Sequence, residues 1–249
     1  MESGGLDGKL FRDNMIRYDI GIGVEAFTAG RGDDLPYPVV QAHQVHGSKV
    51  AVINCAGVTR EELEEFDALV TDVPGVAIGV RTADCIPVLL YDPVHRAVAA
   101  VHAGWKGTLA RISRMAIFEM SREYGTAAED LLAVIGPGIC GGCFQVGEEV
   151  AGFFKEAGFQ MDGIYSWNGA KVEGDMKTGH HIDLPEANRR LLVEEGVRPE
   201  NIRVSDICTY ETGGLYSARR EGPQCGRNIN AIMLAGISAS GNQRHAAAL

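Results

Sequence analysis

The chain has 249 residues, of which 45% are hydrophobic, so it can bury a full core as one large domain or two small ones. Its formal net charge is −10, which argues against binding to nucleic acid or to an anionic membrane, because both need a positive field. No apolar run approaches the roughly 18 residues that span a bilayer, and the acidic N-terminus does not resemble a secretory signal, so we expect a cytoplasmic protein.

Strands are expected to dominate the first half of the chain. Residues 1–14 are predicted to be a loose segment that precedes a single domain over 15–249. Apolar and β-branched runs separated by Asp, Pro and Gly turns are typical of strands. They predict strands at 16–28, 38–53, 66–71, 76–81, 86–91 and 96–102. A helix is expected after Gly104, where apolar residues from Leu109 to Met120 recur at helical spacing.

The second half mixes helices and strands. A strand is expected at 131–136, followed by a helix from about Gly147 to Ala157, whereas the polar stretch 160–181 supports no assignment. Pro185 suits the first turn of a helix that stops at Gly196. Further strands are expected near 201–205, 213–218 and 228–237. Because strands outnumber helices and do not alternate strictly with them, the pattern favours α+β layers over a doubly wound sheet.

Three compact motifs of small residues each contain a side chain that can bind a metal. They are QVHG with His46, TADC with Cys85 and VHAGW with His102. Imidazole and thiolate groups hold zinc, and three protein ligands leave a fourth tetrahedral position for water or substrate. Zinc in such a site lowers the pKa of a bound water toward neutrality. The motifs predict a catalytic zinc site if the fold brings them together.

The same side chains allow a mechanism without metal. Cys85 could be a thiolate nucleophile with His102 as its base and Asp84 as the orienting carboxylate, which leaves His46 without a role. Each cysteine or histidine could also be an ordinary core residue. Asp84 and Asp67 could orient a ligand histidine, and turn or capping roles are equally open for both.

The other cysteines add a further alternative. Six cysteines in a chain of this length are too sparse for a disulfide scaffold, so we expect thiols or ligands. Cys140 and Cys143 form C-G-G-C, which resembles half of a zinc knuckle or a redox pair, but there is no second C-x-x-C or matching histidine pair. If either of them closed a four-ligand zinc shell, the chain would be a non-enzymatic, metal-bound binding module.

Arginines near these motifs suit a phosphate ligand. Arg81 lies four residues before Cys85, and Arg219, Arg220 and Arg227 fall within nine residues. Guanidinium groups match the oxygens of phosphate, and three in so short a segment of an acidic protein are consistent with a phosphate site. A solvated or salt-bridged loop is the alternative. We therefore predict Arg81, Asp84 and Cys85 as catalytic residues and the four arginines as phosphate ligands.

Several long motifs in a fixed order resemble those of a known family. They are QVHGSKV (44–50), FDALVTDVPGVAIGVRTADC (66–85), ADCIPVLLYDP (83–93), VHAGWKGT (101–108), IGPGICGGCFQVG (135–147), HIDL (181–184), CT (208–209), LYSARREG (215–222) and GRNINAI (226–232). The chain resembles the laccase-domain family, also labelled multicopper polyphenol oxidases, whose members are zinc-dependent purine nucleoside phosphorylases and include peptidoglycan editing factors. The resemblance implies a single-domain layered α-β-β-α sandwich with mixed sheets. It also implies that His46, Cys85 and His102 are the zinc ligands.

The resemblance also carries functional expectations. It implies phosphorolysis of adenosine, inosine or methylthioadenosine to the base and ribose 1-phosphate, with adenosine deamination as a side activity. A hydrolase that edits cell-wall muramyl peptides, through the zinc water or through Cys85, is the alternative. The expected partners are purine nucleosides and phosphate, with no nucleic acid and no membrane, and we expect a monomer.

The copper name can be tested by counting ligands. A blue copper centre takes two histidines and a cysteine, and a laccase adds a trinuclear cluster that needs roughly eight more histidines. The chain has seven histidines in total and no H-x-H, so it is not a multicopper laccase.

The chain departs from the family pattern in three places. Only about a dozen residues connect Thr28 to Gln41, where the family usually has a longer segment with a helix. The usual C-C-Y-E-V reads G-C-F-Q-V and brings Gln145, and Ala218 stands where an aromatic residue or histidine is usual. The predicted metal ligands are intact, whereas the substrate contacts of the family are altered.

Overall fold

The computed structural model describes residues 15–236. The predicted loose segment 1–14 and the end of the last predicted strand lie outside the described residues. Within them, no helix is long and apolar enough to cross a membrane. The single domain over 15–249 stays a prediction.

Two central strands carry the longest buried runs. β7 (Ile86–Asp92) and β8 (Ala97–Ala103) pair antiparallel and are buried at every residue. Side chains alternate between the two faces of a strand, so Val88 and Leu90 join one core cluster while Leu89 joins the other. Both faces are therefore covered, which explains why the sequence here reads as an unbroken apolar run.

Two mixed sheets pack face to face across the second of these clusters. The six-stranded sheet has the order β13-β9-β7-β8-β5-β4, and the five-stranded sheet has the order β1-β2-β14-β6-β3. The remaining strands of the first sheet are β4 (Val50–Val52), β5 (Ala68–Thr71), β9 (Leu132–Ile135) and β13 (Ile202–Val204). The second sheet contains β1 (Ile16–Tyr18), β2 (Val24–Ala29), β3 (Val39–Gln41), β6 (Ala77–Thr82) and β14 (Asn228–Leu234). Each of these two sheets contains both parallel and antiparallel pairs.

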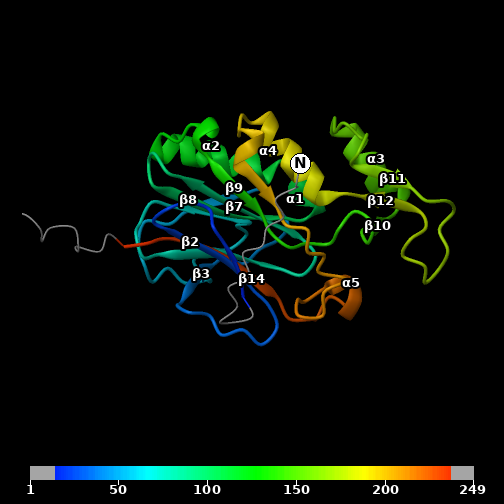
Figure 1. The fold of residues 1–249 in the computed structure, drawn as a ribbon, viewed down its shortest axis with the longest axis horizontal. Coiled ribbons are helices and arrows are strands. Elements are labelled where there is room, and N and C mark those ends of the chain that lie inside the picture. Colours follow the sequence, from blue (N-terminus) through cyan, green and yellow to red (C-terminus); the bar gives the residue numbers. More distant parts are fainter. Residues whose placement is uncertain (1–14, 237–249) are drawn as a thin grey trace, which may run out of the picture.

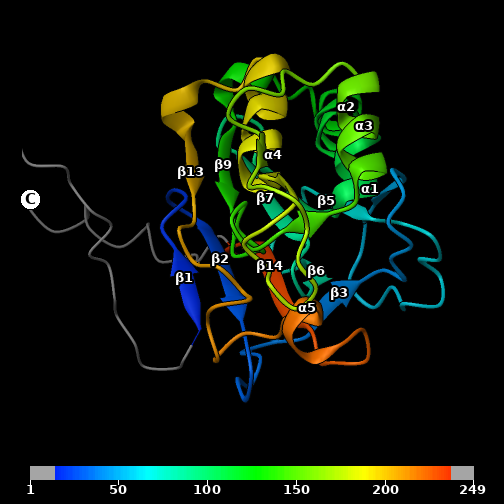
Figure 2. The same ribbon diagram turned by 90° about the vertical axis from the view of Figure 1, so that its right-hand side faces the viewer.

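Helices cover the outer face of the six-stranded sheet (Figure 1). They are α1 (Trp105–Leu109), α2 (Ile112–Tyr124) and α4 (Leu184–Glu194). Helix α3 (Glu148–Glu156) packs on a small third sheet of β10 (Gln145–Val146), β12 (His180–Ile182) and β11 (Tyr165–Trp167) (Figure 1). In the turned view of Figure 2, α1, α2, α3 and α4 lie together at the top, above β14 and β6. The short helix α5 (Ala218–Glu221) and 3₁₀ turns at Ala128–Asp130 and Pro199–Asn201 complete the elements.

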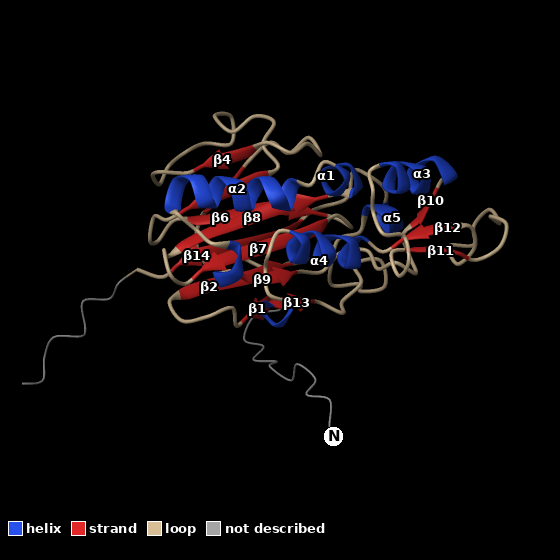
Figure 3. Cartoon of the chain, turned by 90° about the horizontal axis from the view of Figure 1, so that it is seen from above, coloured by secondary structure: helices blue, strands red, loops and turns tan. Residues whose placement is uncertain are grey.

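The predicted α+β fold of layered mixed sheets is confirmed, and its helices are concentrated on one side. Seen from above, in Figure 3, α1, α2 and α4 lie over the strands. The connection between Thr28 and Gln41 contains no helix, as its length indicates, so it adds none to the other outer face. The predicted helix from Pro185 is confirmed as α4, whose N-cap Asp183 accepts a hydrogen bond from the backbone of Glu186.

Several predicted boundaries are wrong for identifiable reasons. The helix after Gly104 divides into α1 and α2 because Arg111 adopts the left-handed conformation (φ 56°). The predicted strand 16–28 is interrupted at Gly21 and Gly23, which both have positive φ. The predicted strand 38–53 is likewise interrupted, by the turn that carries His46.

The predicted strand 213–218 does not form. Ser217 caps α5 by accepting a hydrogen bond from the backbone of Arg220. The Arg220 guanidinium in turn donates a hydrogen bond to the carbonyl oxygen of Leu215. In a sheet, a backbone N–H of a neighbouring strand would donate to this oxygen.

Candidate metal centre

Three of the predicted site residues meet at one end of the sheet interface. The ligand atoms of His46, Cys85 and His102 all lie within 4.8 Å of one another. His102 is the last-but-one residue of β8 and lies on the face that packs between the sheets. Cys85 lies in the connection by which the chain crosses from β6 to β7. His46 lies in the turn between β3 and β4 and adopts a positive φ of 62°. We call these three residues the ligand trio.

A fully buried carboxylate supports two members of the trio. Asp67 accepts a hydrogen bond at 2.7 Å from Nδ1 of His102. It also accepts backbone N–H bonds from Val45, His46 and Gly47, at 3.2, 2.9 and 2.7 Å. Because Asp67 occupies Nδ1, His102 is left with Nε2 toward a ligand, as in carboxylate–histidine–metal arrangements. One carboxylate thus orients the ring of His102 and shapes the His46 turn.

Charges within the trio perturb one another strongly. Burial disfavours the Cys85 thiolate, but the charge and hydrogen bonds of His102 and His46 outweigh it and lower the pKa of Cys85 to about 6. Burial likewise opposes the imidazolium of His102, yet Cys85 and Asp67 raise the pKa of His102 to about 9. Burial would raise the pKa of Asp67, but hydrogen bonds from His102 and the backbone leave it lowered. The sulfur is therefore held as a thiolate, the form that binds metals.

A glycine keeps one side of the trio open. A Cβ atom added to Gly104 would lie 3.0 Å from Sγ of Cys85 and 3.0 Å from Cδ2 of His46. Only a residue without a side chain leaves that approach free, which explains the glycine in VHAGW.

The trio borders a cavity of about 650 Å³ whose other walls carry cations. Arg60, Arg81, Arg219 and Arg227 all line it. Burial, followed by the nearby charges of Arg60 and Arg227, lowers the pKa of Arg81. Over residues 15–236, no carboxylate forms an ion pair with Arg60, Arg81 or Arg227. Positive charge that the protein leaves unpaired beside a metal site favours an anionic ligand.

Comparison with known proteins identifies the family. Residues 30–235 match the family model described as multi-copper polyphenol oxidoreductase laccase. The chain belongs to this laccase family. It is 40% identical over 206 residues to a protein of Bacteroides thetaiotaomicron named purine nucleoside phosphorylase, over 81% of this chain and 74% of that protein. It is 41% identical over 207 residues to "Adenosine deaminase RL5" of an unknown prokaryotic organism, covering 80% and 75% of the two chains.

A solved structure shares the fold of this laccase-family chain. The crystal structure of the Bacillus licheniformis hypothetical protein YfiH superimposes with a TM-score of 0.73 at 27% sequence identity. The match covers 85% of this chain and 92% of that one. Together with the names of the relatives, it supports an enzyme of this family.

Asp84, predicted to be catalytic, holds the turn that presents Cys85. It adopts a positive φ of 88°, a conformation that aspartate and asparagine tolerate better than most residues other than glycine. Its Oδ1 accepts the hydroxyl of Thr209 and its Oδ2 accepts the backbone N–H of Arg219, both at 2.7 Å. Its carbonyl oxygen accepts the N–H of Ile139. These three contacts fix the strained turn, which favours a positioning role for Asp84.

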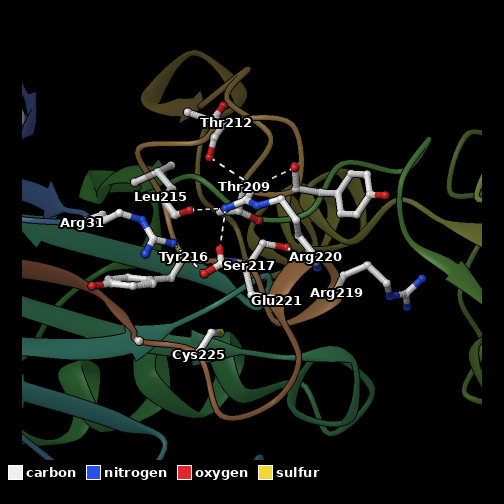
Figure 4. Close-up of polar contacts among 12 residues, drawn as sticks. Arg31, Thr209, Thr212, Leu215, Tyr216, Ser217, Arg219, Arg220, Glu221 and Cys225 are labelled. Carbon is white, nitrogen blue, oxygen red and sulfur yellow. Dashed lines mark hydrogen bonds and ion pairs between the residues drawn. The ribbon is translucent and has the colours of Figure 1, made fainter.

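The predicted phosphate-binding arginines divide into two groups. Arg81, Arg219 and Arg227 line the cavity of this laccase-family chain, whereas Arg220 does not. In Figure 4 the Arg220 guanidinium lies among backbone carbonyl oxygens. It donates to carbonyl oxygens between 209 and 215 and to the carboxylate of Glu221, which occupies its donors. The Arg227 guanidinium also donates to backbone carbonyl oxygens, those of Pro223, Cys225 and Gly226, but Arg227 lines the cavity. Arg220 lies outside the cavity and is therefore omitted from the proposed phosphate site.

Two residues of the cavity were missed by sequence reasoning. Arg60 lies in an acidic stretch, TREELEEF, where a lone arginine gives no indication of its role. Gln44 lies in the QVHG motif, and its side-chain amide makes two hydrogen bonds to the backbone of Arg81, at 2.8 and 2.9 Å. Gln44 thereby ties the turn of His46 to the strand that carries Arg81. Ala218, one of the departures from the family pattern, also lines the cavity.

The cysteines of C-G-G-C do not close the shell of the trio. Cys140 and Cys143 belong to a separate group of ligand atoms with Cys208 and Glu211. The four-ligand shell that a non-enzymatic binding module would need is therefore not formed by these cysteines.

Proposed function

We propose that this chain is a zinc-dependent purine nucleoside phosphorylase. It would convert adenosine, inosine or methylthioadenosine and phosphate to the free base and the corresponding ribose 1-phosphate. The observation that carries the proposal is the ligand trio opening onto a cavity lined by arginines without carboxylate partners. The names of the relatives, purine nucleoside phosphorylase and adenosine deaminase, support it at the level of the family.

The chemistry of the trio fits zinc. Two imidazole nitrogens and one thiolate sulfur within 4.8 Å of one another are a borderline-soft donor set, which zinc accepts with tetrahedral geometry. His46, Cys85 and His102 would hold the ion, and Asp67 would keep the His102 ring in position. When bound, the metal supplies a Lewis acid that stabilises negative charge on an oxygen ligand.

The arginines would hold the attacking phosphate. Arg81 is half-buried, and the positive charges of Arg60 and Arg227 lie close enough to lower its pKa. An anion bound among the three guanidinium groups would be attracted by all of them. In phosphorolysis a phosphate oxygen forms a bond to C1′ of the ribose while the bond from C1′ to the purine nitrogen breaks. The electron pair leaves with the purine, which takes up a proton. Guanidinium groups that fix the phosphate would orient its oxygen toward C1′.

Adenosine deamination is proposed as a second activity of the same site. Water would attack C6 of the purine and ammonia would leave, so phosphate is not consumed. One relative carries the name adenosine deaminase, which supports this activity. Nucleosides and phosphate are thus the proposed partners of a monomeric, cytoplasmic enzyme.

A thiol-dependent amidase is the second candidate. The pKa of Cys85 is lowered to about 6 and His102 lies beside it, which is the pairing that activates a cysteine nucleophile. Such an enzyme would cleave an amide bond, as in muramyl peptides, and would need no metal. Chelation distinguishes the two mechanisms, because it would abolish phosphorolysis and leave a thiol amidase active.

The proposed function is tested with adenosine and inosine in the presence and absence of phosphate. We expect ribose 1-phosphate only when phosphate is present, and ammonia release from adenosine in both cases. The Cys85→Ala variant should lose the zinc of the ligand trio and both activities together, whereas the control Cys55→Ala, which replaces an exposed cysteine, should retain them. Full activity in a Cys85→Ala protein that has lost the zinc of the ligand trio would end the proposal.

A further inference from the structure

A second group of metal-binding side chains lies outside the ligand trio and its cavity. Cys140, Cys143, Cys208 and Glu211 bring three sulfur atoms and a carboxylate oxygen within 4.8 Å of one another. The proposed phosphorolysis uses none of these side chains. The first two form C-x-x-C, and the last two form C-x-x-E much further along the chain. The spacing of the first pair is common in zinc sites, and the second pair repeats it with a carboxylate.

The local fold of the C-x-x-C segment directs its sulfurs toward each other. The carbonyl oxygen of Cys140 accepts the N–H groups of Cys143 and Phe144, at 3.0 and 2.9 Å, which closes a tight turn. Gly141 permits this turn, because an added Cβ would come within 2.9 Å of the Asp183 side chain. Gly141 therefore allows the turn to pack closely against Asp183 at the start of α4.

Backbone contacts join the C-x-x-E segment to this turn. Cys208 forms a parallel bridge with Gly138, and Thr209 donates to the carbonyl oxygen of Gly138 at 3.0 Å. The N–H of Cys140 donates to Sγ of Cys208 at 3.4 Å. The two half-sites are thus assembled by the fold itself.

Burial and access also suit a bound ion. Cys143 and Cys208 are buried, Cys140 is half-buried, and Glu211 is exposed. Three of the four residues line a second cavity of about 530 Å³, which offers a path for an ion from solvent. Zinc binds cysteine as the thiolate, so binding of the ion would release the protons of these thiols. A soft divalent ion with tetrahedral geometry would satisfy all four ligands.

We propose that this chain holds a structural zinc ion at Cys140, Cys143, Cys208 and Glu211, distinct from the metal of the ligand trio. Four protein ligands close the coordination shell, as in structural sites. The ion would clamp two segments that both contact Asp84. Ile139 donates to its carbonyl oxygen, and Thr209 donates to its carboxylate. Loss of this zinc would loosen the turn that presents Cys85.

The test measures zinc content and cobalt spectra in a protein in which the ligand trio can no longer bind metal. Cys85→Ala should still retain about one zinc per chain after gel filtration, measured by mass spectrometry of the metal. Cobalt substituted into this variant should show the absorption of sulfur-to-cobalt charge transfer. Adding Cys143→Ala should remove both the zinc and the absorption. Adding Cys55→Ala, which replaces an exposed cysteine outside both groups, should change neither.

Milder variants protect the test against misfolding. His46→Ala removes a different ligand of the trio, at an exposed position, and should also leave about one zinc per chain at the four-ligand site. Glu211→Gln in the Cys85→Ala protein removes no buried group and should weaken zinc binding about tenfold. The proposal is overturned if the folded Cys85→Ala and His46→Ala proteins both bind no zinc. It is also overturned if Cys143→Ala leaves the zinc content unchanged, or if the intact mass shows a disulfide among the three cysteines. None of these measurements depends on nucleoside turnover.

Discussion

Replacing Asp67 with asparagine would remove one acceptor and the negative charge that support the metal centre. The carboxylate is fully buried and accepts four hydrogen bonds, one from Nδ1 of His102 and three from backbone N–H groups of residues 45–47. Asparagine has a single oxygen, and its amide NH₂ donates. In either orientation of the asparagine side chain, its NH₂ group faces two of the four donors that the carboxylate oxygens of Asp67 now accept from.

The size of the effect follows from the hydrogen bonds that are lost. A buried donor left without an acceptor costs about 1–3 kcal/mol, and the backbone donors here are only partly buried, so Asp67→Asn should destabilise the fold by about 1–3 kcal/mol. Loss of the carboxylate that orients a ligand histidine should weaken metal binding about 10–100-fold. At about 1.4 kcal/mol per factor of ten, this corresponds to about 1.4–2.8 kcal/mol of binding free energy.

Two measurements separate these effects. Urea unfolding of the metal-free protein gives the change in stability, and competition with a chromogenic chelator gives the zinc affinity of the folded fraction. Asp72→Asn is the matched control, because Asp72 is an exposed aspartate just after the same strand, and it should change neither quantity. Wild-type zinc affinity in a folded Asp67→Asn protein would refute the role assigned to Asp67.

Three further substitutions test the cavity, the open side of the trio and a surface ion pair. Arg81→Ala should raise the KM for phosphate about 10–100-fold, as expected when a charge-assisted hydrogen bond is lost, while Arg122→Ala on α2 should leave it unchanged in the same initial-rate assay. Gly104→Ala should reduce zinc affinity and turnover at least about tenfold, because its Cβ would displace Cys85 and His46, whereas Gly152→Ala, which meets nothing within 4 Å, should change neither. Hydrogen bonds from two arginines of α4 outweigh partial burial and lower the pKa of Glu186 to about 2, so its stabilising contribution is present above about pH 4.5 and is lost as the pH falls toward 2. Glu186→Gln should therefore cost about 1 kcal/mol at pH 7, after screening by solvent, and nothing near pH 2; an equal cost in urea unfolding at both pH values would contradict this assignment.

The parts of the fold that sequence predicted best are those where one physical signal dominates. The apolar runs of β7 and β8 predict buried strands because both faces are covered. Pro185 and Gly196 delimit α4 because their backbone preferences act locally. The ligand trio could be predicted because imidazole, thiolate and glycine in short motifs suggest metal chemistry. Its meeting in space depends on the pairing of β8 with β7 and β5, which no local pattern contains.

The features that escaped prediction depend on contacts between distant segments. Arg219 and Arg220 are adjacent in sequence, yet only Arg219 lines the cavity, because carbonyl oxygens of a neighbouring loop bind the guanidinium of Arg220. Arg60 lies in an acidic stretch, and only the fold brings its charge close to Arg81. Cys208 has no cysteine neighbour in sequence, so C-x-x-C has no visible partner until the chain folds.

Zinc-edge anomalous diffraction from crystals of the zinc-loaded protein with phosphate tests the central claim most directly. The account predicts an anomalous peak about 2.0–2.3 Å from the ring nitrogens of His46 and His102 and from Sγ of Cys85. The fourth position should hold water or a phosphate oxygen on the side of Arg81. No peak between these three side chains, or a fourth protein ligand that closes the shell, would contradict the account.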